Sequence, residues 1–402
     1  MKNNKVVLAF SGGLDTSFCA VYLRTVKQLE VHAVMVNTGG FSPEELKLAE
    51  KHAFSLGVNS FTVLDETASY YHSCIRFLIY GNVLKNKSYP LSVSAERVSQ
   101  AKAIALFAEK INADYIAHGS TGAGNDQVRF DMVFQHLIPN VEILTPVRDL
   151  QLSREEEIVF LEKHGIKMNA AKAIYSINKG LWGTSVGGKE TLTSDKYLPE
   201  EAFPSQLEQT NPQQITLEFS KGELTAVNGN SFSAAEKAIQ HLQELAAPYA
   251  IGRDIHTGDT VIGIKGRVGF EAAAPMIIIK AHHTLEKHVL TKWQLFLKDQ
   301  LSDWYGQFLH EGQYFDPVMR DLESFFESSQ ENVSGKVFVT LHPYRFVING
   351  IESPHDMMSP EFGSYGEMNK SWSGEDVKGF SKIFGNNVSV FNKVNKISAQ
   401  LT

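Results

Sequence analysis

Residues 11–17, SGGLDTS, combine small, hydroxyl and acidic side chains in a pattern that could hold a phosphate. They follow an apolar run, Val6–Phe10, and precede an amphipathic one. Glycines between a strand and a helix leave backbone N–H groups uncovered, and the helix N-terminus adds partial positive charge. The hydroxyl groups can donate further hydrogen bonds, but Asp15 would repel a phosphate unless a cation such as Mg²⁺ intervened. The stretch predicts a phosphate-binding turn, although a strand–helix turn without a ligand could share this local sequence.

Two other stretches resemble phosphate motifs less well. Gly122–Gly124 lacks the third glycine of a dinucleotide fingerprint. Residues Gly183–Lys189, GTSVGGK, approach a Walker A motif, but Glu190 stands where the motif requires Ser or Thr. We therefore predict a flexible loop at Gly183–Lys189 rather than a P-loop.

Strands and helices alternate over the first third of the chain. Apolar runs predict strands at Lys5–Phe10, Val31–Val36, Phe61–Leu64 and Asp114–Ala117. One helix is expected to begin after Ser42, with Glu45 three residues later completing a capping box, and another covers Ser94–Lys110. This alternation predicts a parallel sheet whose ligands bind beyond the carboxyl ends of its strands. Residues 11–17 and 118–129 both fall at such ends.

The remaining sequence predicts an α+β arrangement. Strands are expected at Gln214–Phe219, Leu224–Val227, Thr260–Ile264, Met276–Ile279, Lys336–Leu341 and Tyr344–Ile348. Helices are expected at Ala234–Leu245, at Asp376–Ile383 and, without interruption, at His283–Leu309. Residues 178–212 are rich in Gly, Ser, Thr and Pro, which predicts a long loop or linker.

The bulk composition excludes several classes of protein. The 402 residues carry a formal net charge of −7, which disfavours nucleic acid as the main partner. The two cysteines, Cys19 and Cys74, lie far apart, which indicates a reducing compartment without disulfides or a zinc ribbon. Val6–Phe10 is too short for a signal peptide, and Ala272–Ile279 is too short to cross a bilayer. We expect a cytoplasmic protein without a membrane segment.

Three blocks of sequence resemble a known family. SGGLDTS resembles the pyrophosphatase loop of the ATP pyrophosphatases, which release pyrophosphate and leave an adenylate. HGSTGAGNDQVRF at 118–130 and YSINKGLWGTS at 175–185 resemble the argininosuccinate synthases. The resemblance implies a C–N ligase of arginine biosynthesis. It would condense citrulline and aspartate with Mg²⁺ and ATP, through a citrullyl-adenylate, to argininosuccinate, AMP and pyrophosphate.

The resemblance also implies an α/β fold with three parts. The first, 1–168, would be a parallel-sheet nucleotide-binding domain of the ATP pyrophosphatase type. The second, 169–357, would be an α+β synthetase domain for citrulline and aspartate. The third, 358–402, would be a C-terminal tail that joins the subunits of a homotetramer.

Site residues follow from the resemblance, position by position. ATP would be bound by Ala9, Phe10, Ser11, Gly12, Gly13, Leu14, Asp15, Thr16, Ser17, Val36 and Gly119. Aspartate would be bound by Thr121, Asn125 and Asp126, and citrulline by Tyr89, Ser94, Asn125, Arg129, Ser176 and Ser185. No metal site is expected from protein groups alone, because Mg²⁺ would arrive with ATP and find at most Asp15.

Each assignment has a plainer alternative. Arg129 could be an ordinary surface arginine, Tyr89 could serve packing alone, and Ser176 and Ser185 could cap turns. His118 is expected to be a hydrogen-bonded structural histidine rather than a base.

The sequence departs from the family at two places. Asn178, Lys179 and Gly180 stand where members usually carry Asp-Glu-Asn. Gly258 and Phe270 stand where members offer Glu and Tyr to citrulline, and Asp259 could substitute for the glutamate by a small shift in register. How citrulline is held is therefore open.

Two other functions remain to be separated from this one. The first is another adenylating enzyme of the same loop class, amidating or tRNA-modifying; the acidic composition and the lack of a CxxC pair argue against it. The second is a non-catalytic module that binds adenine nucleotides, which would need neither a second domain nor Asp126 and Arg129. The nucleotide products released with each substrate omitted in turn distinguish all three.

Overall fold

The computed structural model describes residues 4–167, 175–358, 361, 363, 365–367 and 371–396. The chain forms two compact units, Met1–Pro354 and His355–Thr402. The boundary expected between residues 168 and 169 lies outside the described residues. In the described part, no helix combines the length and the apolar character needed to span a membrane.

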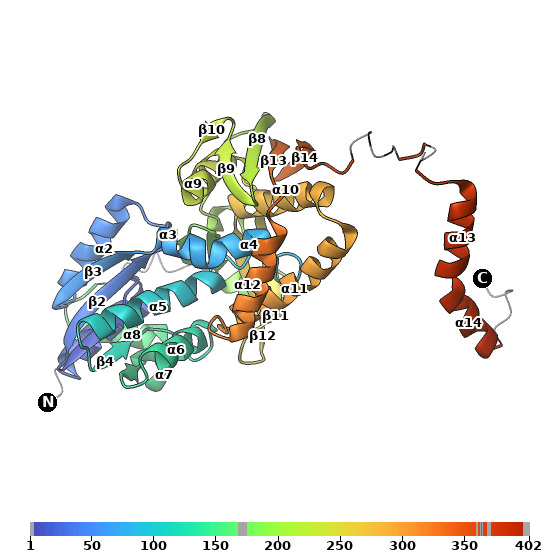
Figure 1. The fold of residues 1–402 in the computed structure, drawn as a ribbon. Helices are drawn as coiled ribbons and strands as arrows, with labels where there is room; N and C mark the ends of the chain where they lie inside the picture. The colour runs from blue at the N-terminus through green and yellow to red at the C-terminus, as the bar shows by residue number, and fades with distance from the viewer. Residues whose placement is uncertain are drawn as a thin grey trace. The chain divides into compact units, whose positions relative to one another are not determined.

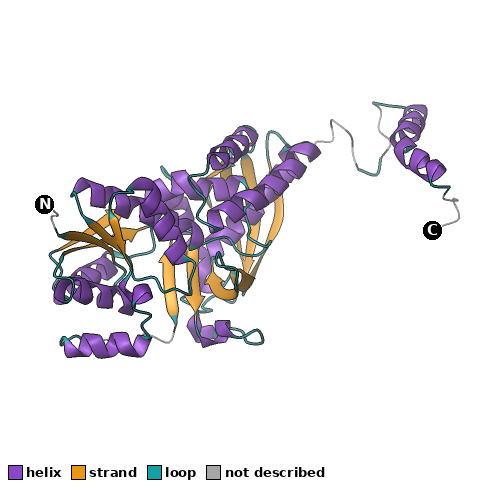
Figure 2. Ribbon diagram, turned by 90° about the horizontal axis from the view of Figure 1, so that it is seen from below, coloured by secondary structure: helices purple, strands orange, loops and turns teal. Residues whose placement is uncertain are grey.

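A parallel sheet of five strands, in the order β3-β2-β1-β4-β5, organises the N-terminal part of the larger unit (Figures 1 and 2). Its strands are β1 (Lys5–Ala9), β2 (Glu30–Asn37), β3 (Ser60–Asp65), β4 (Tyr115–Ala117) and β5 (Glu142–Leu144). Its helices are α1 (Leu14–Thr25), α2 (Pro43–Ser55), α3 (Thr67–Tyr70), α4 (Arg76–Tyr80), α5 (Ser94–Lys110), α6 (Asp126–Leu137), α7 (Pro146–Asp149) and α8 (Arg154–Lys163), with a π-helical turn at Tyr71–Ile75.

Alternation along β1 explains why helices cover both faces of this sheet. Val6 and Leu8 pack in one apolar cluster with side chains of α1, α2 and α8, whereas Val7 and Ala9 pack with side chains of α5. Because successive strand residues point to opposite faces, a strand covered on both sides is apolar throughout. The predicted parallel sheet is confirmed, and so is the capping box of α2, in which the Ser42 side chain accepts from the Glu45 backbone N–H.

The described remainder of the larger unit contains helices and two antiparallel sheets, and the strands of the first sheet are labelled in Figure 1. One has the order β10-β9-β8-β13-β14: β8 (Gln213–Ser220), β9 (Glu223–Val227), β10 (Asn230–Ser231), β13 (Gly335–His342) and β14 (Arg345–Glu352). The other has the order β11-β12-β7-β6: β6 (Ser176–Gly180), β7 (Gly183–Gly187), β11 (Arg253–Asp259) and β12 (Lys265–Glu271). The accompanying helices are α9 (Ala235–Ala246), α10 (Ala273–Val289), α11 (Lys292–His310) and α12 (Pro317–Ser329).

The predicted long loop at 178–212 is wrong in its first part. β6 and β7 form a hairpin, and β7 also pairs with β12, with Ser185 opposite Phe270. The expected flexible loop at Gly183–Lys189 is therefore mostly a strand. Small residues suit it because close neighbours surround them: a Cβ on Gly183 would lie 2.8 Å from the Ala272 side chain. Composition alone cannot reveal such packing.

Three further element predictions are wrong for similar reasons. Thr260–Ile264 is the turn between β11 and β12, closed by a hydrogen bond from Thr260 N to Ile264 O of 2.8 Å. Met276–Ile279 lies inside α10, where Ile277, Ile278 and Ile279 are all buried. A helix buried on several sides has a continuous apolar run like that of a buried strand, so the sequence pattern does not distinguish the two. The single helix expected at His283–Leu309 is two helices, because the Thr291 side chain caps α11.

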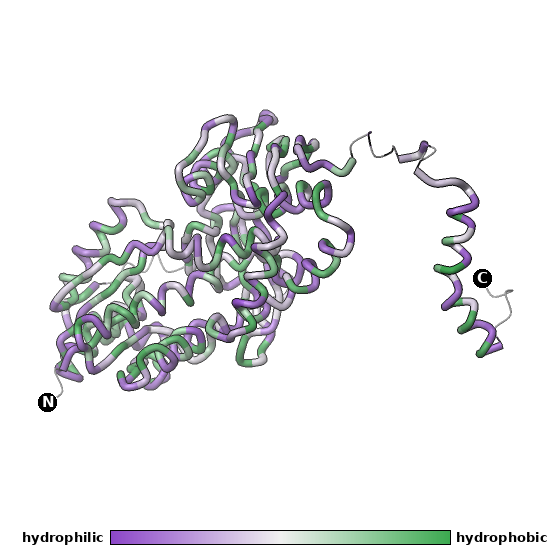
Figure 3. Tube along the Cα trace, viewed as in Figure 1, coloured by the Kyte–Doolittle hydropathy of each residue, from purple (hydrophilic) through white to green (hydrophobic). Residues whose placement is uncertain are grey.

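The residues that the structure describes in the smaller unit include the helices α13 (Gly374–Phe384) and α14 (Asn386–Val394). The helix predicted at Asp376–Ile383 is confirmed, and α14 was not expected. Neither helix buries a residue, and Figure 3 shows apolar positions recurring along both. These exposed side chains include Val377, Phe380, Ile383, Phe384, Val388, Phe391 and Val394.

Candidate active site

A cavity of ≈ 1170 Å³ in the larger unit is lined by residues at the carboxyl ends of β1, β2 and β4, by β6 and β7, and by the β11–β12 hairpin. This is the edge at which ligands of parallel sheets bind. All the residues expected to contact ATP, aspartate or citrulline line it except Ser17. The tertiary structure thus gathers residues that lie as far apart in the chain as Ala9 and Ser185.

The glycine turn closes one half of the cavity. Gly12 has φ +78°, a left-handed conformation that favours glycine. Gly13 precedes α1, and no side chain caps this helix, so the N–H groups of its first turn are left for a ligand. The hydroxyls of Ser11 and Thr16 lie 3.3 Å apart beside this turn. The geometry is that of an anion site at a helix N-terminus.

Ser17 is turned away from this site. Its hydroxyl donates to the Gly13 carbonyl at 2.7 Å and lies 2.8 Å from Nε2 of His52. Because the carbonyl takes the single hydroxyl proton, His52 Nε2 must be the donor in the second bond. Ser17 therefore stabilises the turn, and His52, on α2, donates the hydrogen bond that holds the Ser17 hydroxyl in place.

Close packing between two elements sets the position of Asp15. A Cβ on Gly119 would lie 3.1 Å from the Asp15 carbonyl carbon and 3.2 Å from Thr16 N, so glycine lets the segment after β4 approach α1. Burial raises the pKa of the Asp15 carboxyl, and the nearby Arg154 opposes this. His118 is held by Asp131 at 2.9 Å and accepts from Ser120 N, which is the structural role expected of it.

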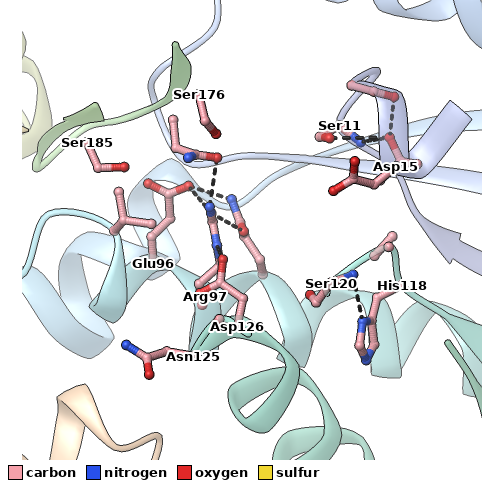
Figure 4. A pocket seen from close by; sticks show the side chains of 18 of the residues that line it. Ser11, Asp15, Glu96, Arg97, His118, Ser120, Asn125, Asp126, Ser176 and Ser185 are labelled. Carbon is pink, nitrogen blue, oxygen red and sulfur yellow. Dashed lines mark hydrogen bonds and ion pairs between the residues drawn. The ribbon is translucent and has the colours of Figure 1, made fainter. Parts of the chain in front are cut away.

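A cluster of charged side chains occupies the other half of the cavity (Figure 4). Asp126, at the start of α6, accepts from Arg97 Nε at 2.9 Å and from Arg129 Nη1 at 3.0 Å. Burial favours the neutral acid, but the two guanidinium groups outweigh it and lower the pKa of Asp126 to about 2. Asp126 is therefore a carboxylate throughout the physiological pH range.

Arg129 is not the surface residue of the plainer alternative. It is 3% exposed, and its guanidinium donates to the His310 carbonyl, at 3.0 Å from Nε and 2.8 Å from Nη2, and to the Ser94 hydroxyl. Asp126 accepts from one of the two N–H groups of Nη1. The other N–H of Nη1 is left without a partner among the described residues.

Three other expected residues have partners of their own. Tyr89 is buried, its ring stacks on His256 at 5.0 Å, and its hydroxyl accepts from Val93 N. The Asn125 Oδ1 atom accepts from Val261 N at 2.8 Å and so ties the β11–β12 turn to the site. Ser185 is buried on β7, whereas Ser176 is exposed at the start of β6.

The structure adds residues that the sequence did not single out, among them Glu96, Arg97, His256 and His310. Arg97 lies in the same block as Tyr89 and Ser94, YPLSVSAER, and a cation beside Asp126 could have been sought there. His310 ends α11, far along the chain, and nothing local marks it.

Each of the two places where the sequence departs from the family contains a glycine that lies against a neighbouring side chain. A Cβ on Gly258 would lie 2.7 Å from His256 Nε2, so His256 occupies the space beside this glycine. Asp259 pairs with Lys265 at 2.6 Å and is largely exposed. A Cβ on Gly180 would overlap Glu96 Oε2.

Metal and thiol chemistry have little support in the described part of the chain. It holds no cluster of three or more His, Cys, Asp or Glu side chains suited to a metal ion. Cys19 and Cys74 are buried and unpaired, and burial raises the pKa of both thiols. Neither is therefore an activated nucleophile.

The fold and the site define a nucleotide-binding α/β protein whose ligand cavity also contains a guanidinium–carboxylate cluster. The family model "Arginosuccinate synthase N-terminal HUP domain" matches residues 5–167, and "Arginosuccinate synthase C-terminal domain" matches 175–391. The chain belongs to the argininosuccinate synthase family.

Curated relatives agree along nearly the full chain. The argininosuccinate synthase of Xylella fastidiosa is 34% identical over 98% of this chain and 99% of its own. That of Dictyoglomus thermophilum is 36% identical over 96% of each chain. That of Methanocaldococcus jannaschii is 34% identical over 94% of this chain and 95% of its own.

Proposed function

We propose that the protein is a C–N ligase that condenses L-citrulline and L-aspartate with ATP to argininosuccinate, AMP and pyrophosphate in arginine biosynthesis. One observation carries the proposal: a single cavity joins an uncapped helix N-terminus to a cluster of two guanidinium groups and a carboxylate. The first half suits a polyphosphate and the second suits amino acids.

The reaction needs positioning more than covalent work by the protein. The ureido oxygen of citrulline attacks the α-phosphorus of ATP, a new O–P bond forms, and pyrophosphate leaves. The α-ammonium of aspartate gives one proton to solvent, and the resulting amine attacks the ureido carbon. The C–O bond to AMP breaks, and the nitrogen loses a second proton, which leaves one N–H in the guanidinium of the product. AMP departs with the oxygen that came from citrulline.

The expected residues divide between the two halves in this mechanism. The ATP set is Ala9, Phe10, Ser11, Gly12, Gly13, Leu14, Asp15, Thr16, Val36 and Gly119, with Ser17 supporting the turn from inside. Asp126 receives the α-ammonium of aspartate, and Thr121 and Asn125 receive its carboxylates. Tyr89, Ser94, Asn125, Arg129, Ser176 and Ser185 surround citrulline, with the remaining N–H of Arg129 facing its carboxylate.

Mg²⁺ fits this site only together with ATP. Asp15 is the carboxylate beside the phosphate turn, and Mg²⁺ is commonly held by one or two carboxylates and the substrate's phosphates. When bound, the ion offsets the charge that develops on the pyrophosphate. Asp15 would then orient the phosphates, and its pKa, raised by burial, would fall again beside a cation.

We also infer a cytoplasmic homotetramer joined through the C-terminal helices. The support is the row of apolar side chains that α13 and α14 leave exposed within their own unit. Large apolar side chains in such a row typically mark a contact with another chain.

The products formed with each substrate omitted in turn test the proposed reaction. The complete mixture should release AMP and pyrophosphate in equal amounts, and omission of ATP or citrulline should stop the release. Release of ADP and phosphate, or AMP formation independent of citrulline, would refute the reaction.

Isotope transfer tests the order of the steps. Citrulline labelled with oxygen-18 at the ureido oxygen should deliver the label to the phosphate of AMP, and argininosuccinate should carry none at its guanidino carbon. Label in pyrophosphate, or none in AMP, would exclude the citrullyl-adenylate.

A further inference from the structure

Glu96 is a buried carboxylate in the amino-acid half of the cavity for which the proposed reaction has no use. It lies in the first turn of α5 and is 2% exposed. Its Oε1 atom accepts from Gln100 Nε2 at 2.5 Å and from Arg97 Nη1 at 3.3 Å. Its Oε2 atom has no hydrogen-bond partner among the described residues. Burial of an ionisable carboxyl group costs free energy, and a functional role would explain why Glu96 stands at this position.

The absence of a side chain at Gly180 makes room for this carboxylate. A Cβ at that position would overlap Glu96 Oε2, so the carboxylate occupies the volume that a side chain on β6 would fill. Asn178, two residues earlier on β6, accepts a hydrogen bond from Arg97 Nη2 at 2.9 Å. Arg97 is therefore held from its own helix by Glu96 and Gln100, from α6 by Asp126 and from β6 by Asn178 (Figure 4).

The charges of this cluster balance only if Glu96 is ionised. Arg97 and Arg129 are cations, and Asp126 alone neutralises one of them. Ionised Glu96 neutralises the other, whereas neutral Glu96 leaves a net positive charge beside Asp126. A net positive charge beside Asp126 weakens the attraction of this carboxylate for the α-ammonium of aspartate, whose two carboxylates are assigned to Thr121 and Asn125.

We propose that Glu96 is a positioning residue for aspartate binding: its carboxylate holds Arg97 against Asp126 and offsets the second guanidinium charge there. The proposal rests on the proposed function, because Asp126 is the group assigned to the α-ammonium of aspartate. Glu96 acts through Arg97 and touches no reacting atom.

The proposal makes aspartate binding depend on pH, with a definite sign. Burial raises the pKa of Glu96 to about 7, against the opposing effect of Arg97. Aspartate itself keeps one charge state between about pH 6 and about pH 8. As the pH falls through this range Glu96 takes up a proton, the cluster becomes positive, and aspartate binds more weakly. The groups that face Glu96 from the surrounding elements are Arg97, Asp126, Tyr70, Thr38, Asn178 and Gly180.

Other titrating groups can be separated from Glu96. Burial brings the pKa of His310 to about 3, so His310 stays neutral as Glu96 titrates, and burial also lowers the pKa of His256. Burial also raises the pKa of Glu157 to about 7, with Asp15 adding to the effect, but Glu157 lies on α8 and does not line the cavity. Its titration should change the KM for ATP rather than for aspartate.

The test compares KM values for all three substrates across about pH 6 to about pH 8. Glu96→Gln keeps the shape and the acceptor but removes the charge. At about pH 8 it should raise the KM for aspartate about fivefold or more, with kcat and the other KM values within about twofold. At about pH 6 parent and variant should converge, because the parent's Glu96 is then protonated. Glu157→Gln is the matched control and should keep the parent's aspartate profile.

A second variant distinguishes charge from packing. Asn178→Asp, added to Glu96→Gln, places a carboxylate against Nη2 of the same guanidinium and should restore at least half of the lost aspartate affinity. If Glu96 were needed only for packing on α5, a carboxylate on β6 would not replace it.

Several results would overturn the proposal. One is an aspartate KM of the parent that is the same at both ends of the pH range, which requires no variant to fold. Another is a Glu96→Gln enzyme that matches the parent throughout, or a double variant without any recovery. The parent's products are measured first, so that failure of the proposed reaction itself is seen separately.

Discussion

At the scale of single residues, Arg129 shows how tertiary contacts change an expectation. The resemblance assigned Arg129 to the binding of citrulline alone. In the structure most of its N–H groups bind Asp126, Ser94 and the His310 carbonyl. Arg129 therefore also positions Asp126, and its loss should affect both amino-acid substrates.

Arg129→Lys should raise the KM for citrulline and for aspartate while leaving that for ATP within about twofold. A lysine keeps the charge but cannot make the planar set of contacts. The loss of one hydrogen bond to a charged group is on the order of 1.5–3 kcal/mol, or about tenfold or more in affinity. Calorimetric titration of each substrate checks this, and equal weakening of ATP would show that Arg129 maintains the fold instead.

At the scale of elements, the contact between the segment after β4 and the start of α1 controls the phosphate half. Gly119→Ala would bring a Cβ to 3.1–3.2 Å from backbone and side-chain atoms of Asp15 and Thr16. Such a contact is too short for van der Waals packing, so α1 must shift by a few tenths of an ångström.

The expected result for Gly119→Ala is a higher KM for ATP with little change in either amino-acid KM. Steady-state kinetics with each substrate varied gives the three values. Gly124→Ala is the matched control, because nothing lies within 4 Å of its added Cβ. An effect of Gly119→Ala on citrulline alone would place the nucleotide elsewhere in the cavity.

At the scale of the whole molecule, the C-terminal unit predicts self-association. α13 and α14 bury nothing, and the rings of Phe380 and Phe384 stack on each other at 5.3 Å while exposed. Replacing Phe380, Phe384 and Phe391 by serine in the full chain should convert the proposed tetramer to smaller species at unchanged secondary structure. Light scattering measures the mass, and an unchanged mass would rule out this unit as the joint.

Buried histidines should make the whole molecule sensitive to acid. Burial lowers the pKa of His282 to about 4 and that of His310 to about 3, whereas both groups titrate near about 6.5 when unfolded. Below that pH the unfolded chain binds more protons, so stability is complete above about pH 6.5 and is lost as the pH falls towards about 4. His282→Gln should flatten the fall of Tm over this range, and an unchanged slope would assign acid unfolding to other groups.

Local physical rules in the sequence were enough for the parallel sheet, the capping box of α2 and the glycine turn between β1 and α1. Apolar runs, glycines and capping residues act on their own neighbours, so their effects can be read along the chain. The resemblance of three short blocks added the family and a group of site residues, all of which except Ser17 line the cavity.

Tertiary structure alone determined the contacts between distant segments. Apolar residues 276–279 became helix rather than strand because packing on all sides, not alternation, sets their environment. The small residues of β7 became a strand because β6 and β12 supply its hydrogen bonds. The hydrogen bond from Arg97 to Asn178 and the packing of Glu96 against Gly180 join α5 to β6, and no pattern within either segment indicates these contacts. Burial and pairing depend on what the fold brings close, and that is information the local sequence does not contain.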